Sequence, residues 1–172
     1  MSQQENQIMI ENIILNSVKN NKKQKEGDKT LLPVFDNSQF PLITVSFSTT
    51  LDKPAFMHFF QKWLECYRRD EDFTFIFNLT TIKWISPSYA LLIIKFMKNL
   101  RKYQSQLPHL KTSIIVLNNN LIRGLLFRVF KVQPPISHIY LVSTIDHAIK
   151  IYQNDEVAKA ISVNIPPNTL LK

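Results

Sequence analysis

The sequence contains very little glycine and cysteine. Its two glycines, Gly27 and Gly124, lie far apart, whereas the phosphate-binding loops of Walker and dinucleotide-binding folds need several glycines close together. The scarcity of glycine therefore argues against these nucleotide-binding folds. The single cysteine, Cys66, has no second thiol with which to form an internal disulfide or a cysteine-based zinc site. We interpret it as a core or boundary residue in a protein from a reducing compartment.

Long hydrophobic runs are missing too. No apolar stretch approaches the roughly 20 residues that a membrane-spanning helix needs. The residues after Met1 lack the basic and apolar regions of a secretory signal. We therefore expect no transmembrane segment and a cytoplasmic location.

The residues that usually build catalytic or metal sites are dispersed. None of the four histidines has a partner at the spacing that places two ligands on one helix face; they are His58, His109, His138 and His147. The acidic residues fall at expected helix caps, in loops and in tails, where a negative charge suits a helix N-terminus or solvent. We predict no metal site, no cofactor and no catalytic residues, and thus a protein that is not an enzyme.

The net charge is positive, at +8. One basic cluster, Lys19–Lys25, lies in a polar segment, and the remaining Lys and Arg residues are spread over the polar faces of expected helices. Two interpretations follow. The charges can form a surface for nucleic acid, whose phosphates attract clustered Lys and Arg, or they can simply be solvated helix faces.

The chain divides into three parts by pattern. Residues 1–39 combine a short apolar stretch with a polar run that has no periodicity, which predicts an N-terminal arm and linker. Residues 40–153 carry the regular patterns of a single domain. Residues 154–172 contain Pro166-Pro167 and are predicted to form a C-terminal tail.

Strand and helix patterns alternate through the domain. Strands are predicted in four apolar stretches, residues 42–47, 73–79, 112–117 and 139–142. Helices are predicted between and after them, over residues 56–67, from Ser86 or Pro87 to Lys102, over 121–131 and up to Tyr152. Because parallel neighbours need such crossovers, the alternation predicts an α/β fold with a small, mostly parallel sheet covered by helices. The first strand is the candidate for antiparallel pairing.

The helix that begins at Ser86 or Pro87 has an amphipathic pattern. Its spacing predicts an inward face made by Leu91, Ile94, Met97 and Leu100, and a solvent face made by Lys95, Lys98, Arg101 and Lys102. The basic residues lie late in the helix, where they suit its dipole.

Several segments, in this order, resemble a STAS domain. Phe75–Leu79 and Ile82–Ile85 lead to a serine-containing corner, and Thr112–Leu117, Leu121–Phe130 and Tyr140–Ala148 are similar to the closing pattern of that family. STAS domains, the SpoIIAA-like fold, include the bacterial anti-sigma factor antagonists and the cytoplasmic ends of sulfate transporters. The resemblance covers residues 40–153 and implies a regulatory protein–protein interaction module.

The resemblance also indicates candidate site residues. The family signature is Asp-Ser-Ser/Thr-Gly, and this chain has Ser86-Pro87-Ser88-Tyr89 at that place. The match puts Ser88 at the position that a partner kinase phosphorylates, with Ser86 replacing the acid and Tyr89 replacing the glycine. A related branch of switch phosphoproteins carries its hydroxyl earlier, which indicates Ser86 instead.

The residues themselves support two roles for the serines. Ser86 is expected to be the N-cap, its oxygen accepting a backbone N–H at a value of about 1 kcal/mol. Ser88, in the first turn, is expected to project outward, where a phosphate would lie against the positive helix end. The alternative is that both serines and Pro87 only start a helix.

A second group of residues is a candidate partner surface. Twelve Phe are more aromatic surface than a small sheet is expected to hide, and two of them lie beside basic residues on the helix over 121–131. The predicted surface comprises Asn119, Asn120, Arg123, Phe127, Arg128 and Lys131. Three functions remain open: a regulatory binding module, a structural subunit of a virus particle or organellar complex, and a nucleic-acid-binding adaptor. The protein partner would be a regulatory kinase, an assembly partner or a second copy in a homodimer.

Overall fold

The computed structural model describes residues 12, 31–49, 51–103 and 108–167. Most of the predicted N-terminal arm therefore lies outside the described residues. The elements follow one another as β1 (Val34–Asp36), β2 (Leu42–Ser46), α2 (Lys53–Cys66), the 3₁₀ turn η1 (Tyr67–Arg69), β3 (Phe73–Asn78), α3 (Pro87–Lys102), β4 (Leu110–Val116), α4 (Asn120–Val132), β5 (His138–Val142), α5 (Ile145–Tyr152), α6 (Glu156–Ala160) and β6 (Val163–Ile165).

The strands of the described residues form one six-stranded sheet in the order β1-β2-β3-β4-β5-β6. The neighbours from β2 to β5 are parallel, with Val45 opposite Phe77 and Phe77 opposite Ile115. The two outer strands run antiparallel to their neighbours. The predicted α/β fold with a mostly parallel sheet is confirmed, and the strand predicted first is β2, which gains its antiparallel partner from β1.

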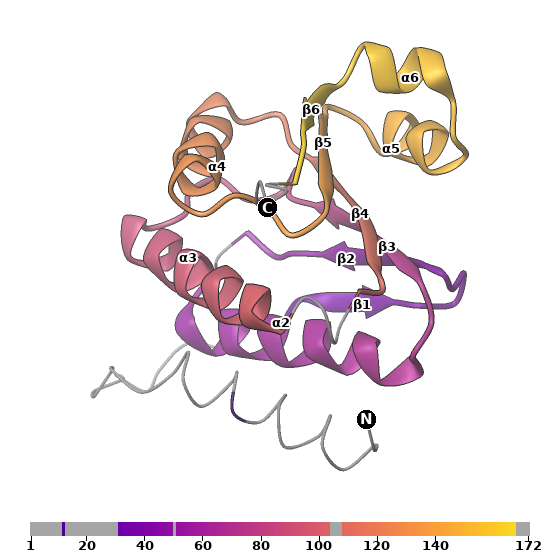
Figure 1. Ribbon diagram of the computed structural model, residues 1–172. Coiled ribbons are helices and arrows are strands. Elements are labelled where there is room, and N and C mark those ends of the chain that lie inside the picture. The colour runs from indigo at the N-terminus through magenta and orange to yellow at the C-terminus, as the bar shows by residue number, and fades with distance from the viewer. Residues whose placement is uncertain (1–11, 13–30, 50, 104–107, 168–172) are drawn as a thin grey trace.

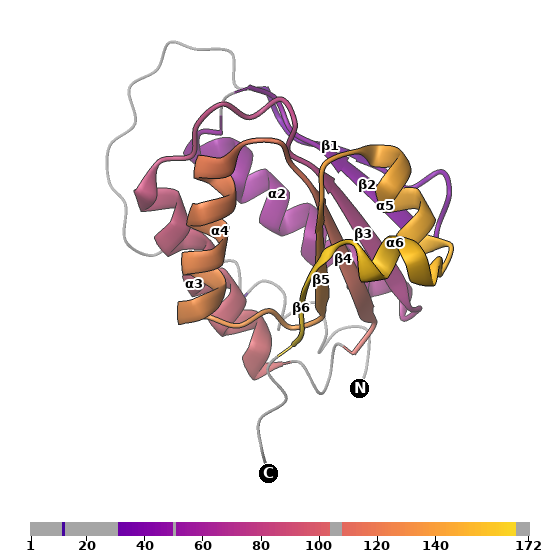
Figure 2. The same cartoon turned by 90° about the horizontal axis from the view of Figure 1, so that it is seen from above.

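Helices cover both faces of the sheet. Helices α2, α3 and α4 lie on one face, and α5 and α6 lie on the other (Figures 1 and 2). Because successive side chains of a strand point to opposite faces, Phe75 and Phe77 join the core under α2, whereas Ile76 joins the core under α5. Burial on both faces explains why β3 is apolar along nearly its whole length.

The larger core is built from aromatic rings. Phe60 of α2 and Phe96 of α3 stack with centroids 4.0 Å apart, and Trp63 packs edge-on against Phe75 at 5.2 Å. Of the twelve Phe, all in described segments, only Phe127 is exposed. The predicted surplus of Phe on the surface is therefore limited to Phe127 on α4, because the space between the sheet and its three helices holds nearly all the other rings.

The sheet extends beyond the predicted domain, residues 40–153, at both ends. β1 lies within the segment predicted as arm and linker, and β6 lies within the segment predicted as tail. Each strand has only three residues, too few to show an alternating pattern. Their pairing partners, β2 and β5, decide their conformation.

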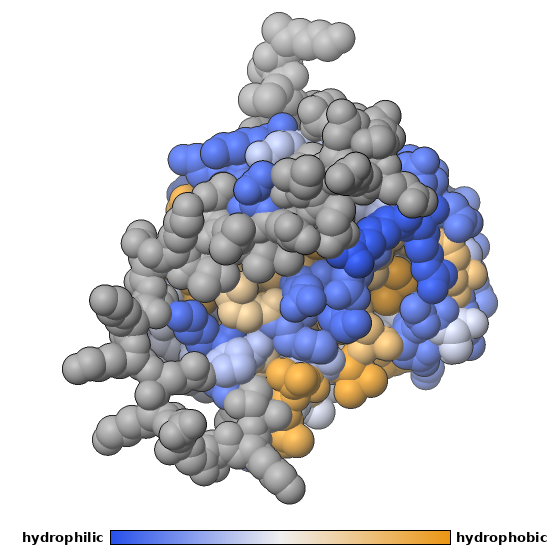
Figure 3. Space-filling view, turned by 90° about the horizontal axis from the view of Figure 1, so that it is seen from below, coloured by the Kyte–Doolittle hydropathy of each residue, from blue (hydrophilic) through white to orange (hydrophobic). Residues whose placement is uncertain are grey.

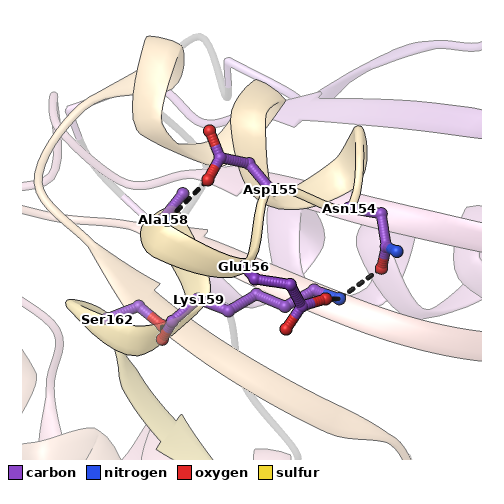
Figure 4. Close-up of polar contacts among 6 residues, drawn as sticks. All are labelled: Asn154, Asp155, Glu156, Ala158, Lys159 and Ser162. Atoms are coloured by element: carbon purple, nitrogen blue, oxygen red, sulfur yellow. Dashed lines mark hydrogen bonds and ion pairs between the residues drawn. The ribbon is translucent and has the colours of Figure 1, made fainter.

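A set of local polar contacts holds the segment between α5 and β6 in place (Figure 4). Asp155 caps α6, with its Oδ1 accepting the backbone N–H of Ala158 at 2.9 Å. Lys159 Nζ lies 2.9 Å from Glu156 Oε1 and also bonds Asn154 Oδ1. Ser162 Oγ donates to the carbonyl of Lys159 at 2.8 Å. These contacts are local to α6, and His147 Nε2, 2.8 Å from the carbonyl of Ala158, joins α6 to α5.

Helix α3 begins at Pro87 after Ser86, as predicted. Its buried residues are Ala90, Phe96, Met97 and Leu100, whereas Leu91, predicted to point inward, is exposed. Phe96 packs against Phe60 of α2, and the rotation of α3 that this packing requires leaves Leu91 outside the buried face of the helix. Arg101, predicted to face solvent, is half-buried, and its Nη2 donates to the carbonyls of Pro134 and Pro135 at 2.6 and 3.0 Å.

Candidate functional site

The predicted corner lies where β3 leads into α3, beside the beginning of α4. Both helices start at the edge of the sheet reached by the C-terminal ends of parallel strands, which is where α/β domains commonly bind ligands. Ile82 and Ile85 anchor the connecting loop in the core, and Trp84 between them projects outward. Asn119 Nδ2 donates to the carbonyl of Lys83 at 3.0 Å and so joins this loop to the start of α4.

The two serines of the corner contact each other. Ser86 occupies the N-cap position, but its side chain accepts no backbone N–H. Its Oγ lies 2.9 Å from Ser88 Oγ, and the N–H of Tyr89 bonds the carbonyl of Ser86 at 2.9 Å. The expected side-chain cap is therefore wrong: Pro87 brings no N–H, and the Ser86 carbonyl takes the N–H of Tyr89. Ser88 is exposed, as its place in the first turn predicts.

Tyr89 does not project freely from the corner. Its ring stacks on Phe56 of α2, with centroids 4.8 Å apart and an interplanar angle of 27°, and the residue is half-buried. Burial first, and then the negative charge of Asp52, raises the pKa of the Tyr89 phenol. Tyr89 thus anchors the first turn of α3 to α2.

The predicted partner surface on α4 divides into two groups. Asn119 and Arg123 are half-buried and bond the backbone: Asn119 Oδ1 accepts from Leu121 N at 2.9 Å and Ile122 N at 3.3 Å, and Arg123 Nη2 donates to the Leu117 carbonyl at 3.4 Å. The other predicted residues are exposed, and they are Asn120, Phe127, Arg128 and Lys131. The first group therefore positions the helix, and the second is available for contact.

A groove opens between the loop before α3 and the outer side of α4. It has a volume of about 280 Å³, and the residues that shape it include Trp84, Pro87, Leu121, Gly124, Leu125 and Arg128. Trp84 is 62% exposed and Leu121 is 73% exposed. Gly124 lines the groove and leaves space, since a Cβ built there would meet nothing within 4 Å. We call this feature the α3–α4 groove.

Trp84, Leu121 and Gly124 were not among the predicted site residues, although the sequence holds a signal for them. On α4 the buried stripe is Ile122, Leu126 and Val129. Leu121 lies one residue before that stripe, about 100° around the helix from Ile122, and its large apolar side chain is not buried in the core. A large apolar residue outside the buried stripe is the pattern that indicates a contact surface.

The charged residues of the groove lining and of helices α3 and α4 are all positive. Residues 73–145 contain no Asp or Glu and nine Lys or Arg. Among the described residues, no Lys or Arg of α3 or α4 forms an ion pair with another of them. This acid-free stretch is the second signal that the predicted site did not use. It makes the α3–α4 side of the domain a basic surface, which we call the basic face.

Exposed hydrophobic residues also occur away from the groove, so exposure alone does not define the site. Leu31, Leu32 and Val34 are exposed at the start of the described domain. On the side seen from below, polar residues cover much of the described surface, and hydrophobic residues show in separate patches, one of them at the lower margin (Figure 3). The groove differs by combining exposed apolar side chains, a hollow and unopposed positive charge.

The remaining reactive groups of the described chain lie outside the groove. Burial raises the pKa of the Cys66 thiol to about 12. His109 lies 3.0 Å from Asp70 and 3.5 Å from Asp72. Within the described residues, no group of three or more His, Cys, Asp or Glu could hold a metal ion. An apolar cavity of about 90 Å³ under the three helices has walls that include Phe60 and Trp63.

Comparisons with protein-family models, with curated proteins and with solved structures yield no match to this chain. The resemblance to STAS domains therefore stays a prediction from the residue pattern. In the part of the chain that the structure describes, no helix has the length and apolarity to cross a membrane.

Proposed function

We propose that the protein is a non-enzymatic, STAS-like interaction module of the cytoplasm that binds another protein at the corner formed by Ser86, Ser88 and the α3–α4 groove. The observation that carries the proposal is the groove itself: Trp84 and Leu121 stand exposed on either side of a hollow. Tryptophan in such a position is typical of residues that dominate binding energy.

Phosphorylation would act on this site through Ser88. Its hydroxyl is exposed at the first turn of α3, 2.9 Å from that of Ser86. A phosphate there adds about 1.5 to 2 negative charges at neutral pH, next to Pro87 on the groove wall. The modification would change the charge and the shape of the groove entrance, so we propose that it regulates binding.

The test compares a groove-filling variant with a matched control. Gly124→Phe places a ring in the hollow, and Val157→Phe places the same ring on α6, where Val157 is exposed on the other face of the sheet. Tagged full-length proteins are purified from the native cell, and the proteins bound to each are identified by mass spectrometry.

A partner of the groove is retained by the wild type and by Val157→Phe and is lost with Gly124→Phe. The purified partner should then bind the wild type directly, and Ser88→Glu should change its affinity whereas Ser88→Ala should not. Equal recovery of every bound protein by Gly124→Phe and Val157→Phe would show that the groove is not the docking site. A partner that proves to be a second copy of the chain would identify a homodimer.

The basic face favours one second candidate, a nucleic-acid-binding adaptor. The Lys and Arg residues of α3 and α4, with no acidic residue in either helix, would attract phosphates. This function predicts that an RNA or DNA oligonucleotide binds the purified protein with an affinity that falls steeply with salt. Binding that is undetectable even at low salt would remove it.

A further inference from the structure

We infer that the segment received by the α3–α4 groove is an acidic amphipathic helix of the partner protein. This inference rests on the proposed function and adds the chemistry of the partner. It follows from three properties of the site: the apolar end of the groove, the position of the positive charges and the shape of the hollow.

The apolar end of the groove lies at the beginning of the two helices. Trp84, Pro87 and Leu121 line it there, and Leu125 follows one turn along α4. On α3, Leu91 lies one turn after Pro87 and is 68% exposed. A ligand in the groove therefore meets an apolar row on α4 and the first residue of a row on α3, which Leu91 continues beyond the groove lining. Such a surface suits residues spaced three and four apart on one helix face.

The positive charges lie farther along the same two rows. On α3, Lys95 and Lys98 follow Leu91 at helical spacing, and on α4, Arg128 follows Leu125. Helices α3 and α4 contain no acidic residue, and none of the ion pairs among the described residues involves these cations. Lysine near a helix C-terminus also suits the helix dipole, but that role does not require the complete lack of Asp and Glu. A surface that binds a partner's carboxylates accounts for this lack, because acidic residues on the surface would repel the partner.

The length of α4 suits a short helix laid along it. Helix α4 has 13 residues, which corresponds to a length of about 20 Å, and an apposed helix of three to four turns would span it. The missing side chain at Gly124 provides the space for one large anchor residue.

The hollow shape of the groove favours an acidic helix over a membrane surface or a nucleic acid, both of which are also attracted to basic surfaces. A membrane surface is flat or convex toward the protein and would be contacted by protruding apolar residues rather than by a hollow. A nucleic-acid backbone is bound through phosphates and would leave Leu121 and Leu125 without a partner. The combination of hollow, apolar rows and cations favours the acidic helix.

The same arrangement predicts whether phosphorylation strengthens or weakens binding. A phosphate on Ser88 would lie at the apolar end of a site that attracts carboxylates, so it would repel an acidic ligand. We expect Ser88→Glu to weaken binding of the helix, with Ser88→Gln as the uncharged control.

The test uses a synthetic probe and the full-length protein. The probe is a dye-labelled peptide of about four helical turns, with Leu at positions 1, 4, 8 and 11 and mostly Glu elsewhere. A scrambled peptide of the same composition is its control. Binding is followed by fluorescence anisotropy, and tryptophan emission reports on the groove, since Trp84 is exposed while Trp63 is buried.

We expect the amphipathic peptide to bind with a blue shift of the Trp84 emission and the scrambled peptide to bind at least about tenfold more weakly, because it cannot present its Leu residues on one face. Arg128→Glu and Gly124→Phe should each lower the affinity about tenfold or more. The matched controls, Lys150→Glu on α5 and Val157→Phe on α6, should leave it unchanged. Raising the salt from about 0.05 to 0.5 M should weaken binding.

Three outcomes would overturn the inference. Equal binding of the scrambled peptide would show that charge alone acts. An RNA oligonucleotide, or vesicles with phosphatidylserine, that shift the Trp84 emission while the peptide does not would identify a different class of ligand. A native partner that is lost with Gly124→Phe but is not displaced by the peptide would leave the proposed function standing and would refute the acidic helix.

Discussion

Replacing Asn119 with alanine should destabilise the protein far more than replacing Ser86, although both residues hold the N-cap position of a helix. Asn119 Oδ1 accepts two backbone N–H groups at the start of α4, and its Nδ2 donates to the carbonyl of Lys83. Ser86 bonds only the hydroxyl of Ser88 among the contacts described for its side chain. Sequence reasoning alone assigns both residues the same capping value.

The expected magnitudes follow from these contacts. Loss of an N-cap costs about 1 kcal/mol, and loss of the exposed hydrogen bond to Lys83, which joins two segments, adds up to about 1 kcal/mol. Asn119→Ala should therefore lower the free energy of unfolding by about 2 kcal/mol, which for a chain of this size is a decrease of about 4 to 8 °C in Tm. Ser86→Ala should cost less than about 0.5 kcal/mol, since water replaces an exposed contact between two hydroxyls.

The assay is urea unfolding followed by circular dichroism, with Asn119→Asp as a third variant. Aspartate keeps the acceptor of the cap but lacks the donor to Lys83, so its stability should lie between those of the wild type and Asn119→Ala. Hydrogen–deuterium exchange should also rise in the loop that carries Trp84 once the bond to Lys83 is lost. A cost for Ser86→Ala that equals the cost for Asn119→Ala would refute the described geometry of both caps.

Three further predictions concern other parts of the fold. Arg101→Met should lower the free energy of unfolding by about 2 kcal/mol, because it removes two charge-assisted bonds to the carbonyls of Pro134 and Pro135. Arg101→Lys should recover part of this loss. A cost of Arg101→Met under about 0.5 kcal/mol in urea unfolding would contradict the prediction. Gly124→Ala should raise the thermal stability by about 1 kcal/mol, because alanine favours the helix and its Cβ meets no neighbour; a fall in Tm would argue against the open groove wall. Cys66 should resist thiol reagents near neutral pH in the folded protein and react after unfolding. Burial raises the pKa of the folded Cys66 thiol from 9.0 to about 12, so the contribution of the thiol to stability is complete below pH 9 and is lost as the pH rises toward 12. Cys66→Ala should therefore make the stability of the protein fall less steeply between pH 9 and 12. A decline as steep as that of the wild type would contradict the burial of the thiol.

The central part of the fold could be predicted from the sequence because its signals are strong and local. The stretch Phe73–Asn78 is apolar on both faces, which is typical of a central parallel strand, and the structure confirms this position. Asn119 caps α4, and Asn is among the residue types preferred at that position. Ser86 and Pro87 likewise predict the start of α3.

The ends of the sheet and the details of the corner depend on contacts that the local pattern does not contain. β1 and β6 are strands because β2 and β5 offer them free edges. Leu91 has helical spacing to the core residues, but the packing of Phe96 against Phe60 sets the rotation of α3 and leaves Leu91 outside. The groove combines residues from two segments more than 30 positions apart, and only the tertiary structure shows that Trp84 and Leu121 share it.

The consecutive order of the six strands has a consequence for how the chain acquires its structure during synthesis. Each new strand docks beside the one made just before it, so no strand has to be inserted between two that are already paired. The ribosome can therefore deliver one strand–helix unit at a time onto a growing edge, and the sheet can form from its N-terminal side before the last residues have been translated.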